Sequence, residues 1–372
     1  MKKTIEKKDW KEATKLAQIG NHTDKQTGAV STPIYLSTTY AHPELGQSTG
    51  FDYTRTANPT RQVLETALAE LEQGRYGFAT SSGMSAIQLV FELFPCNSHF
   101  LVSRDLYGGS YRYFHSLEEN GQYQFTYFNS IAELHAAISL DIAAVFIETP
   151  TNPLMSELSI TEVSELTKAN HTLLIVDNTF LTPILQKPLR LGADLVVHSA
   201  TKFLGGHNDL LAGAVMTNSD KLGERLAFAL NTTGAVLSPF DSWLLIRGLK
   251  TLSLRIRQQE KNAQTLVQFL RQTPLIKEVF YPEKGSMISL KLQNATQIPA
   301  FLKALNIFTF AESLGGVESL VTYPSTQTHA DIPKELRESY GLTDDLLRLS
   351  IGIEAIEDLI QDLKQALIKS AD

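Results

Sequence analysis

A carboxylate and a lysine each follow a short apolar segment, and the two residue types suit pyridoxal-phosphate chemistry. Asp177 ends the run 173–176, and Lys202 comes 25 residues later, in a Ser-Ala-Thr-Lys turn after the run 195–197. Such runs are typical of buried strands, and ligands bind outside the carboxyl ends of strands in an open parallel sheet. There the lysine would form a Schiff base with the cofactor aldehyde, and the aspartate would keep the pyridine nitrogen protonated. A strand-capping acid and an ordinary surface lysine are the alternative for either residue taken alone.

A turn of small residues, 80–86, is a candidate phosphate site. It lies between an expected strand and an expected helix, so its backbone N–H groups and the helix N-terminus would form an anion site around Gly83 and Met84. Ser199 and Thr201 can add hydroxyl donors from the second turn. Simple helix capping also explains a Ser-Ser-Gly turn. The segment matches neither a Walker A loop nor a G-x-G-x-x-G fingerprint.

Two further residues are candidates for contacts with a planar cofactor and a charged substrate. Tyr107 follows another expected strand and precedes two glycines, so its ring could stack on a planar cofactor, although core tyrosines are common. Arg348 lies within an apolar strand-like run, where an unpaired charge is costly. It could bind the carboxylate of an amino-acid substrate or form an internal salt bridge.

Three rival types of function fit less well. His198, His207 and Asp209 could suggest a metal, but the two histidines are nine residues apart with no helical register to join them, so we expect no metal site. The G-x-S-x-G run at 46–50 lies in an irregular stretch, not in the strand-to-helix elbow of a serine hydrolase. A catalytically silent cofactor-binding protein stays open, although the intact Asp177 and Lys202 argue against it.

The elements that must position these residues alternate between strand and helix. Apolar runs at 77–80, 100–103, 124–127, 143–148 and 173–176 are separated by helical patterns, which predicts a mostly parallel, doubly wound α/β sheet. After residue 239 a long helical region, 240–273, leads to shorter strands at 287–292, 307–311 and 347–351 and a closing helix, 356–369. We therefore predict a cofactor-binding domain over 51–245 and a smaller α+β domain over 246–372. Residues 1–50 begin with a charged helix, 4–19, and continue as an irregular arm that we expect to contact a neighbouring subunit.

Composition sets outer bounds on function. The chain has 372 residues, 43% of them hydrophobic and 20% charged, with a net charge of −7 and no basic block that would suggest nucleic acid. We expect no membrane span and no secretory signal. The single Cys96 excludes an internal disulfide and fits a reducing cytoplasm, and we expect it to be a buried spacer.

With these motifs in order, the chain resembles the trans-sulfuration, or Cys/Met-metabolism, family of fold-type I pyridoxal-phosphate enzymes over essentially its whole length. The residues that carry the resemblance are 53–60, 82–84, 105–109, 148–153, 176–179, 199–202, 205–207, 238–241 and 313–319. Matches to this many segments in the same order are specific for the family but less specific for the reaction.

The resemblance implies a role for each matching residue. Lys202 would be the Schiff-base lysine and proton shuttle, Asp177 the partner of the pyridine nitrogen, and Tyr107 the stacking ring. The phosphate would be held by Gly83, Met84, Ser199 and Thr201, and by Tyr53 and Arg55 of a neighbouring subunit. The substrate α-carboxylate would be bound by Arg348, Asn152 and Ser313, and Arg112 matches an active-site arginine of the γ-synthases.

The resemblance also implies an assembly and a reaction. Active sites would be shared across a homodimer, usually within a tetramer. The segment 313–319, with Glu318, resembles cystathionine γ-synthases and γ-lyases, and overall the chain is most similar to the bacterial cystathionine γ-synthase and O-acetylhomoserine thiol-lyase group. The expected activity is γ-replacement on an O-acylhomoserine with cysteine or sulfide, as in methionine biosynthesis. Elimination by a cystathionine γ-lyase or β-lyase is the alternative.

Overall fold

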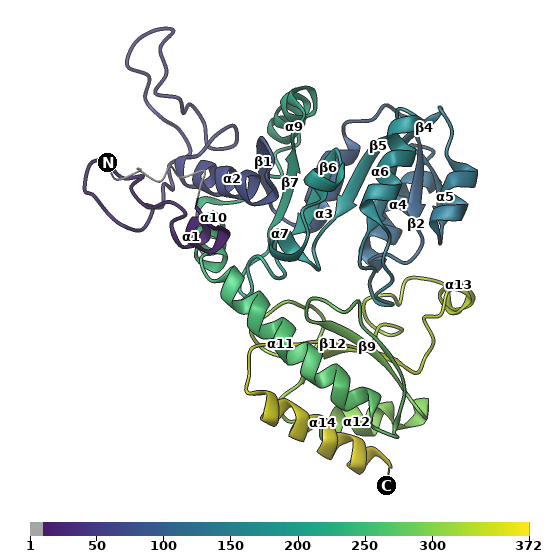
Figure 1. Cartoon of the computed structure of the whole chain (residues 1–372). Coiled ribbons are helices and arrows are strands. Elements are labelled where there is room, and N and C mark those ends of the chain that lie inside the picture. Colours follow the sequence, from purple (N-terminus) through teal and green to yellow (C-terminus); the bar gives the residue numbers. More distant parts are fainter. Residues whose placement is uncertain (1–9, 372) are drawn as a thin grey trace, which may run out of the picture.

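The first half of the chain forms a seven-stranded sheet with the order β1-β7-β6-β5-β4-β2-β3 (Figure 1). The computed structural model describes residues 10–371. The strands are β1 (Tyr76–Thr80), β2 (His99–Ser103), β3 (Gln124–Phe128), β4 (Ile142–Glu148), β5 (Leu173–Asp177), β6 (Leu195–Ser199) and β7 (Gly213–Thr217). Strands β3, β2, β4, β5 and β6 pair in parallel, and β7 runs antiparallel to both β6 and β1. The mostly parallel sheet is therefore confirmed.

Both faces of this sheet are buried, because alternate residues of its central strands enter different clusters of the core. Val145 and Ile147 of β4 belong to one cluster, and Ala144 and Phe146 belong to the other. Burying each large side chain contributes about 1.5–3 kcal/mol, so two continuous apolar faces select helices on both sides. The helices are α2 (Pro59–Glu72), α3 (Gly83–Phe91), α4 (Gly108–Glu119), α5 (Ile131–Ala137), α6 (Ile160–Ala169), α7 (Thr182–Leu185), α8 (Pro188–Leu191) and α9 (Asp220–Thr233).

The second half contains a five-stranded sheet with the order β10-β11-β12-β9-β8. Its strands are β8 (Ile276–Phe280), β9 (Met287–Leu292), β10 (Thr309–Phe310), β11 (Leu320–Thr322) and β12 (Leu346–Ser350). The helices of this half are α11 (Leu252–Arg271), α12 (Ile298–Ala304), α13 (Lys334–Ser339), α14 (Ile356–Ala371) and the short 3₁₀ helix η2 (Ala295–Gln297). Leu347 and Leu349 of β12 join a third core cluster with α11, α12 and α14, so Arg348 between them lies on the opposite face of the sheet.

The helical region expected at 240–273 is two helices, α10 (Pro239–Leu249) and α11. The interruption follows the Gly248 carbonyl, which accepts hydrogen bonds from the Thr251 N–H (3.2 Å) and from the Arg255 guanidinium (2.9 Å). These bonds replace the regular bond to residue 252 that would continue the helix. The predicted domain boundary at residue 245 falls inside α10 and stays a prediction.

Residues before α2 form an arm with little regular structure. Its one described helix is α1 (Glu12–Ala17), and part of the expected helix 4–19 lies outside the described residues. A long excursion of the arm extends from the body in Figure 1. Val30, Leu36 and Leu45 of the arm are largely exposed.

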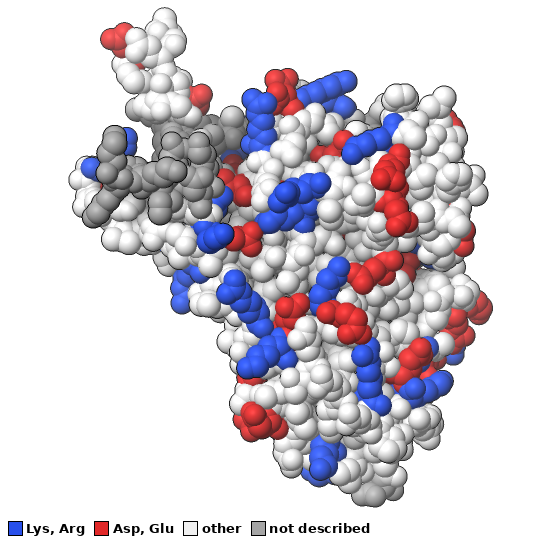
Figure 2. Space-filling model, in the orientation of Figure 1, with Lys and Arg blue, Asp and Glu red and all other residues white. Residues whose placement is uncertain are grey.

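Three surface observations bear on the expectations from composition. Cys96 is exposed, so the expectation that it is a buried spacer is wrong; it lies in the turn between α3 and β2. No helix in the described part of the chain is long and apolar enough to span a membrane. On the face seen in Figure 2, Lys and Arg are interspersed with Asp and Glu.

Candidate active site

One cavity of about 370 Å³ lies at the carboxyl ends of β4, β5 and β6, between the two sheets. Ten of the residues that the sequence singles out line it: Gly83, Met84, Tyr107, Asn152, Asp177, Ser199, Thr201, Lys202, Ser313 and Arg348. They come from both halves of the chain, so the cavity is complete only where the second sheet meets the first.

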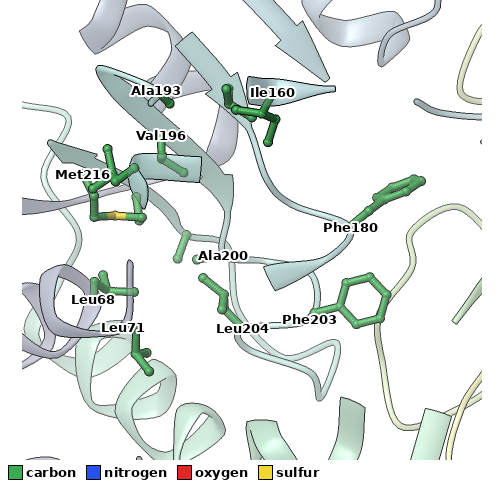
Figure 3. Packing of buried hydrophobic residues seen from close by; sticks show 14 of the residues in the cluster. Leu68, Leu71, Ile160, Phe180, Ala193, Val196, Ala200, Phe203, Leu204 and Met216 are labelled. Carbon is green, nitrogen blue, oxygen red and sulfur yellow. The ribbon is translucent and has the colours of Figure 1, made fainter. Parts of the chain in front are cut away.

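The turn that carries Lys202 is anchored in the core on both sides. Ala200, Phe203 and Leu204 are buried and point into the cluster drawn in Figure 3. The Lys202 amine donates a hydrogen bond to the Ser313 hydroxyl at 3.1 Å. Burial and the positive charge of Arg348 lower the pKa of Lys202 to about 8. A larger fraction of neutral amine is therefore available near neutral pH to react with an aldehyde.

Asp177 is the last residue of β5, and Thr179 fixes its side chain. The Thr179 N–H and hydroxyl both donate to Oδ1 of Asp177, at 2.9 and 2.5 Å. Burial raises the pKa of Asp177, while these two bonds favour its charged form. The carboxylate reaches the cavity as a fixed acceptor, which is what a protonated ring nitrogen requires.

His198 has a buried structural partner, Glu72. Its Nε2 lies 2.6 Å from Oε1 of Glu72, and both side chains are fully buried. The Asn178 amide donates to the same oxygen at 3.0 Å. Within residues 10–371, no group of three or more metal-ligating side chains comes together. Glu72 therefore connects helix α2 to the end of β5, through Asn178, and to the end of β6, through His198.

The N-terminus of α3 opens into the cavity beside Ser199. Ser82 caps the helix by accepting the Ser85 N–H at 3.0 Å. A Cβ at Gly83 would lie 2.7 Å from Cβ of Ser199, so only glycine lets the helix start approach this close. Thr201 holds the same turn by accepting the Ala212 N–H at 3.0 Å. The start of α3, Ser199 and Thr201 line the same cavity, and helix N–H groups with nearby hydroxyls form a donor set that fits a phosphate.

Arg348 is buried and reaches the cavity from β12. It donates to Oδ1 of Asn152 (2.9 Å), to the Ser313 carbonyl (2.8 Å) and to the Thr322 hydroxyl (3.0 Å). Its Nε is buried without a hydrogen-bond partner in the described chain. Ser313 adopts a φ of +106°, a strained conformation for a residue with a side chain. A carboxylate in the cavity would face the guanidinium that these three acceptors hold in place.

Four predicted residues lie outside the lining of this cavity. Tyr53 and Arg55 are on the arm, where the Arg55 guanidinium lies 5.8 Å from the Tyr53 ring centroid. Arg112, on the surface of α4, pairs with the exposed Asp331. Glu318 is exposed and accepts the Asn208 amide at 2.8 Å. Their functional roles stay predictions.

Of the lining residues that were not assigned a role from the sequence, three carry polar groups that bear on the site. Thr179 orients Asp177, and a hydroxyl two residues after the acid is the signal that could have revealed it. Glu148 ends β4, as Asp177 ends β5, and the same strand-end argument applies to it. Glu312 lines the cavity six residues before Glu318, in a loop whose register the sequence alone does not define.

These groups fit pyridoxal phosphate on the chemistry of the donors. The start of α3 with Ser199 and Thr201 would hold a phosphate, the Lys202 amine would react with an aldehyde, and Asp177 would accept from a ring nitrogen. Tyr107 lines the same cavity with its ring partly exposed. Arg348 and Asn152 are not needed for these cofactor contacts, so they remain available to bind a substrate carboxylate.

Comparison with known proteins agrees with this geometry. The model of the Cys/Met metabolism PLP-dependent enzyme family matches residues 13–368. The chain is 57% identical over 356 residues to the cystathionine gamma-synthase/O-acetylhomoserine (thiol)-lyase of Bacillus subtilis (strain 168), covering 95% of each chain. It is 53% identical to the cystathionine gamma-synthase of Haemophilus influenzae, over 95% of this chain and 96% of that one.

More distant comparisons include lyases and a solved structure. The cystathionine gamma-lyase of Bacillus subtilis (strain 168) is 46% identical, over 96% of this chain and 99% of that one. The crystal structure of cystathionine gamma synthase from Xanthomonas oryzae pv. oryzae, in complex with aminoacrylate and cysteine, matches with a TM-score of 0.93 at 39% identity. That match covers 97% of this chain and 99% of the other.

Proposed function

Because the chain belongs to the Cys/Met metabolism family of pyridoxal-phosphate-dependent enzymes, we propose that it catalyses γ-replacement on an O-acylhomoserine. The acyl group leaves as a carboxylate when the Cγ–O bond breaks, and a thiol forms a Cγ–S bond. Cysteine would give cystathionine, and sulfide would give homocysteine. The observation that carries the proposal is the single cavity into which the Lys202 amine, the Asp177 carboxylate and the Arg348 guanidinium all open.

When bound, pyridoxal phosphate supplies an aldehyde and an electron-withdrawing ring that stabilises negative charge at the substrate α-carbon. Arg348 and Asn152 bind the α-carboxylate and thereby orient the α-proton toward Lys202. The Lys202 amine removes that proton and later returns one, and Asp177 holds the proton on the ring nitrogen. The start of α3, with Ser199 and Thr201, holds the phosphate.

The first test is the product that forms from each donor and acceptor. Purified protein is assayed with O-acetyl-, O-succinyl- and O-phosphohomoserine, each with cysteine or sulfide. At saturating cysteine we expect cystathionine to exceed 2-oxobutyrate, because a thiol held near Cγ reacts before water does. Holding that thiol is a matter of positioning, where an error of about 1 Å can cost roughly 10²-fold in rate.

Three outcomes of this assay would contradict the proposal. Dominant 2-oxobutyrate, or consumption of supplied cystathionine, would indicate a lyase, as in the relatives that are 46% identical. Bound cofactor without turnover of any donor would indicate a silent binding protein. Boiled enzyme and cofactor alone give the background.

The assembly we propose is a dimer with shared sites, paired into a tetramer in the cytoplasm. Support comes from the arm, where Tyr53 is half exposed and Arg55 lies outside the cavity of its own chain. Mixing inactive Arg55→Ala and Lys202→Ala subunits should restore about one quarter of wild-type activity, since half of the random dimers are hybrids with one intact site of two.

Subunit exchange is verified with differently tagged chains. The matched control mixes Lys202→Ala with the Arg55→Ala, Lys202→Ala double variant, which cannot form an intact site. If proven exchange restores no more activity than this control, the sites are not shared through Arg55.

A further inference from the structure

A second carboxyl group stands beside Asp177. Glu148 ends β4, and it pairs in register with Asp177 at the end of β5. Adjacent strands lie about 4.8 Å apart, so the two acids are immediate neighbours at the same edge of the sheet. Glu148 is 6% exposed, and no ion pair joins it to a Lys, Arg or His within residues 10–371.

The hydrogen bond that Glu148 accepts comes from the chain at Tyr107. The Tyr107 N–H donates to Oε2 of Glu148 at 2.9 Å. The next residue, Gly108, is packed so tightly that a Cβ there would lie 2.1 Å from the Thr328 carbonyl. The backbone that carries the Tyr107 ring is therefore fixed by Glu148 on one side and by Thr328 on the other.

The charged groups around Glu148 determine whether Glu148 or Asp177 carries a negative charge. Asp177 on β5 and Asp105 after β2 are acidic, and Arg348 on β12 is basic. Burial and the charge of Asp177 raise the pKa of Glu148 well above its usual range, and Arg348 opposes them. Two Thr179 donors stabilise a charged Asp177, whereas Glu148 has one backbone donor. Adjacent buried acids of this kind do not ionise together.

We propose that Glu148 is a positioning residue, which acts as a neutral acceptor for the Tyr107 N–H and leaves Asp177 as the charged acid that would face the ring nitrogen. Its contact with the cofactor is indirect, through the placement of Tyr107 and through the charge on Asp177. The inference rests on the proposed roles of Asp177 and Tyr107.

Two variants of Glu148 test the proposal by cofactor binding rather than by turnover. Glu148→Gln keeps a neutral acceptor of the same length, and Glu148→Ala removes it. Apoprotein of each is titrated with pyridoxal 5′-phosphate, followed by absorbance and tyrosine fluorescence. We expect the Gln variant to bind within about 2-fold of wild type and the Ala variant to bind roughly 3- to 10-fold more weakly, the value of one hydrogen bond.

Asp194→Asn is the matched control. Asp194 is a partly buried acid whose Oδ2 accepts the Leu174 N–H at 2.8 Å, at the opposite end of β5. Its replacement should leave cofactor affinity unchanged, so an effect at Glu148 is not a general effect of removing a buried acid from this sheet.

The pH dependence of cofactor affinity supplies a second measurement that does not need the Ala variant to fold. If Glu148 is neutral, the profiles of wild type and Glu148→Gln coincide between pH 6 and 8. Diverging profiles, a Gln variant that binds as weakly as Ala, or an Ala variant that binds like wild type would each overturn the inference. Wild type that binds no cofactor would instead refute the proposed function.

Discussion

Replacing Lys202 with alanine is expected to lower kcat for γ-replacement by at least roughly 10²–10⁴-fold, the value of general acid–base catalysis by one group. The Lys202 amine lies in the cavity with a pKa lowered to about 8 and donates to Ser313. No second lysine lines the described cavity to replace it. Steady-state rates with O-acetylhomoserine and cysteine measure the loss.

A covalent label identifies the same residue independently of rate. Borohydride treatment of the yellow wild-type protein should fix the cofactor on Lys202, as seen by peptide mapping. Lys187→Ala is the control, because Lys187 is also partly buried but donates to the Leu71 carbonyl away from the cavity. That variant should keep the label and the rate. A label on another lysine, or none, would refute the assignment.

Replacing Arg348 with lysine is expected to lower kcat/KM for the amino-acid donor by about 10²–10³-fold, or about 3–4 kcal/mol. Lysine keeps the positive charge but loses the planar fork that binds a carboxylate with two parallel bonds. It also loses at least one of the bonds to Asn152, Ser313 and Thr322 that hold the group in place.

The measurement is kcat/KM together with the affinity for pyridoxal phosphate, which should change far less. Arg225→Lys is the control, because Arg225 on α9 is exposed and donates to the Leu93 carbonyl outside the cavity. Equal losses for donors with and without an α-carboxylate would show that Arg348 acts through stability rather than through substrate binding.

Much of the site was predictable because strand ends can be recognised in a sequence. The apolar runs before Asp177 and Lys202 form β5 and β6, whose parallel pairing brings the two turns to one edge. Arg348 was recognisable because a charge inside an apolar strand needs a partner, and Asn152 with Ser313 supplies one.

What could not be predicted depends on contacts between distant segments. Nothing local distinguishes Glu312, which lines the cavity, from Glu318, which bonds Asn208 outside it. The exposure of Cys96 likewise depends on how the turn after α3 packs. Sheet pairing rather than periodicity defines β7, which begins at a glycine, and β11, which has only three residues.

The way the cavity draws on both sheets has a consequence for the order of synthesis. The lining residues from Gly83 to Lys202 are translated before Ser313 and Arg348, which lie more than 100 positions later in the chain. A growing chain would therefore expose the proposed cofactor contacts before the proposed contacts to a substrate carboxylate exist.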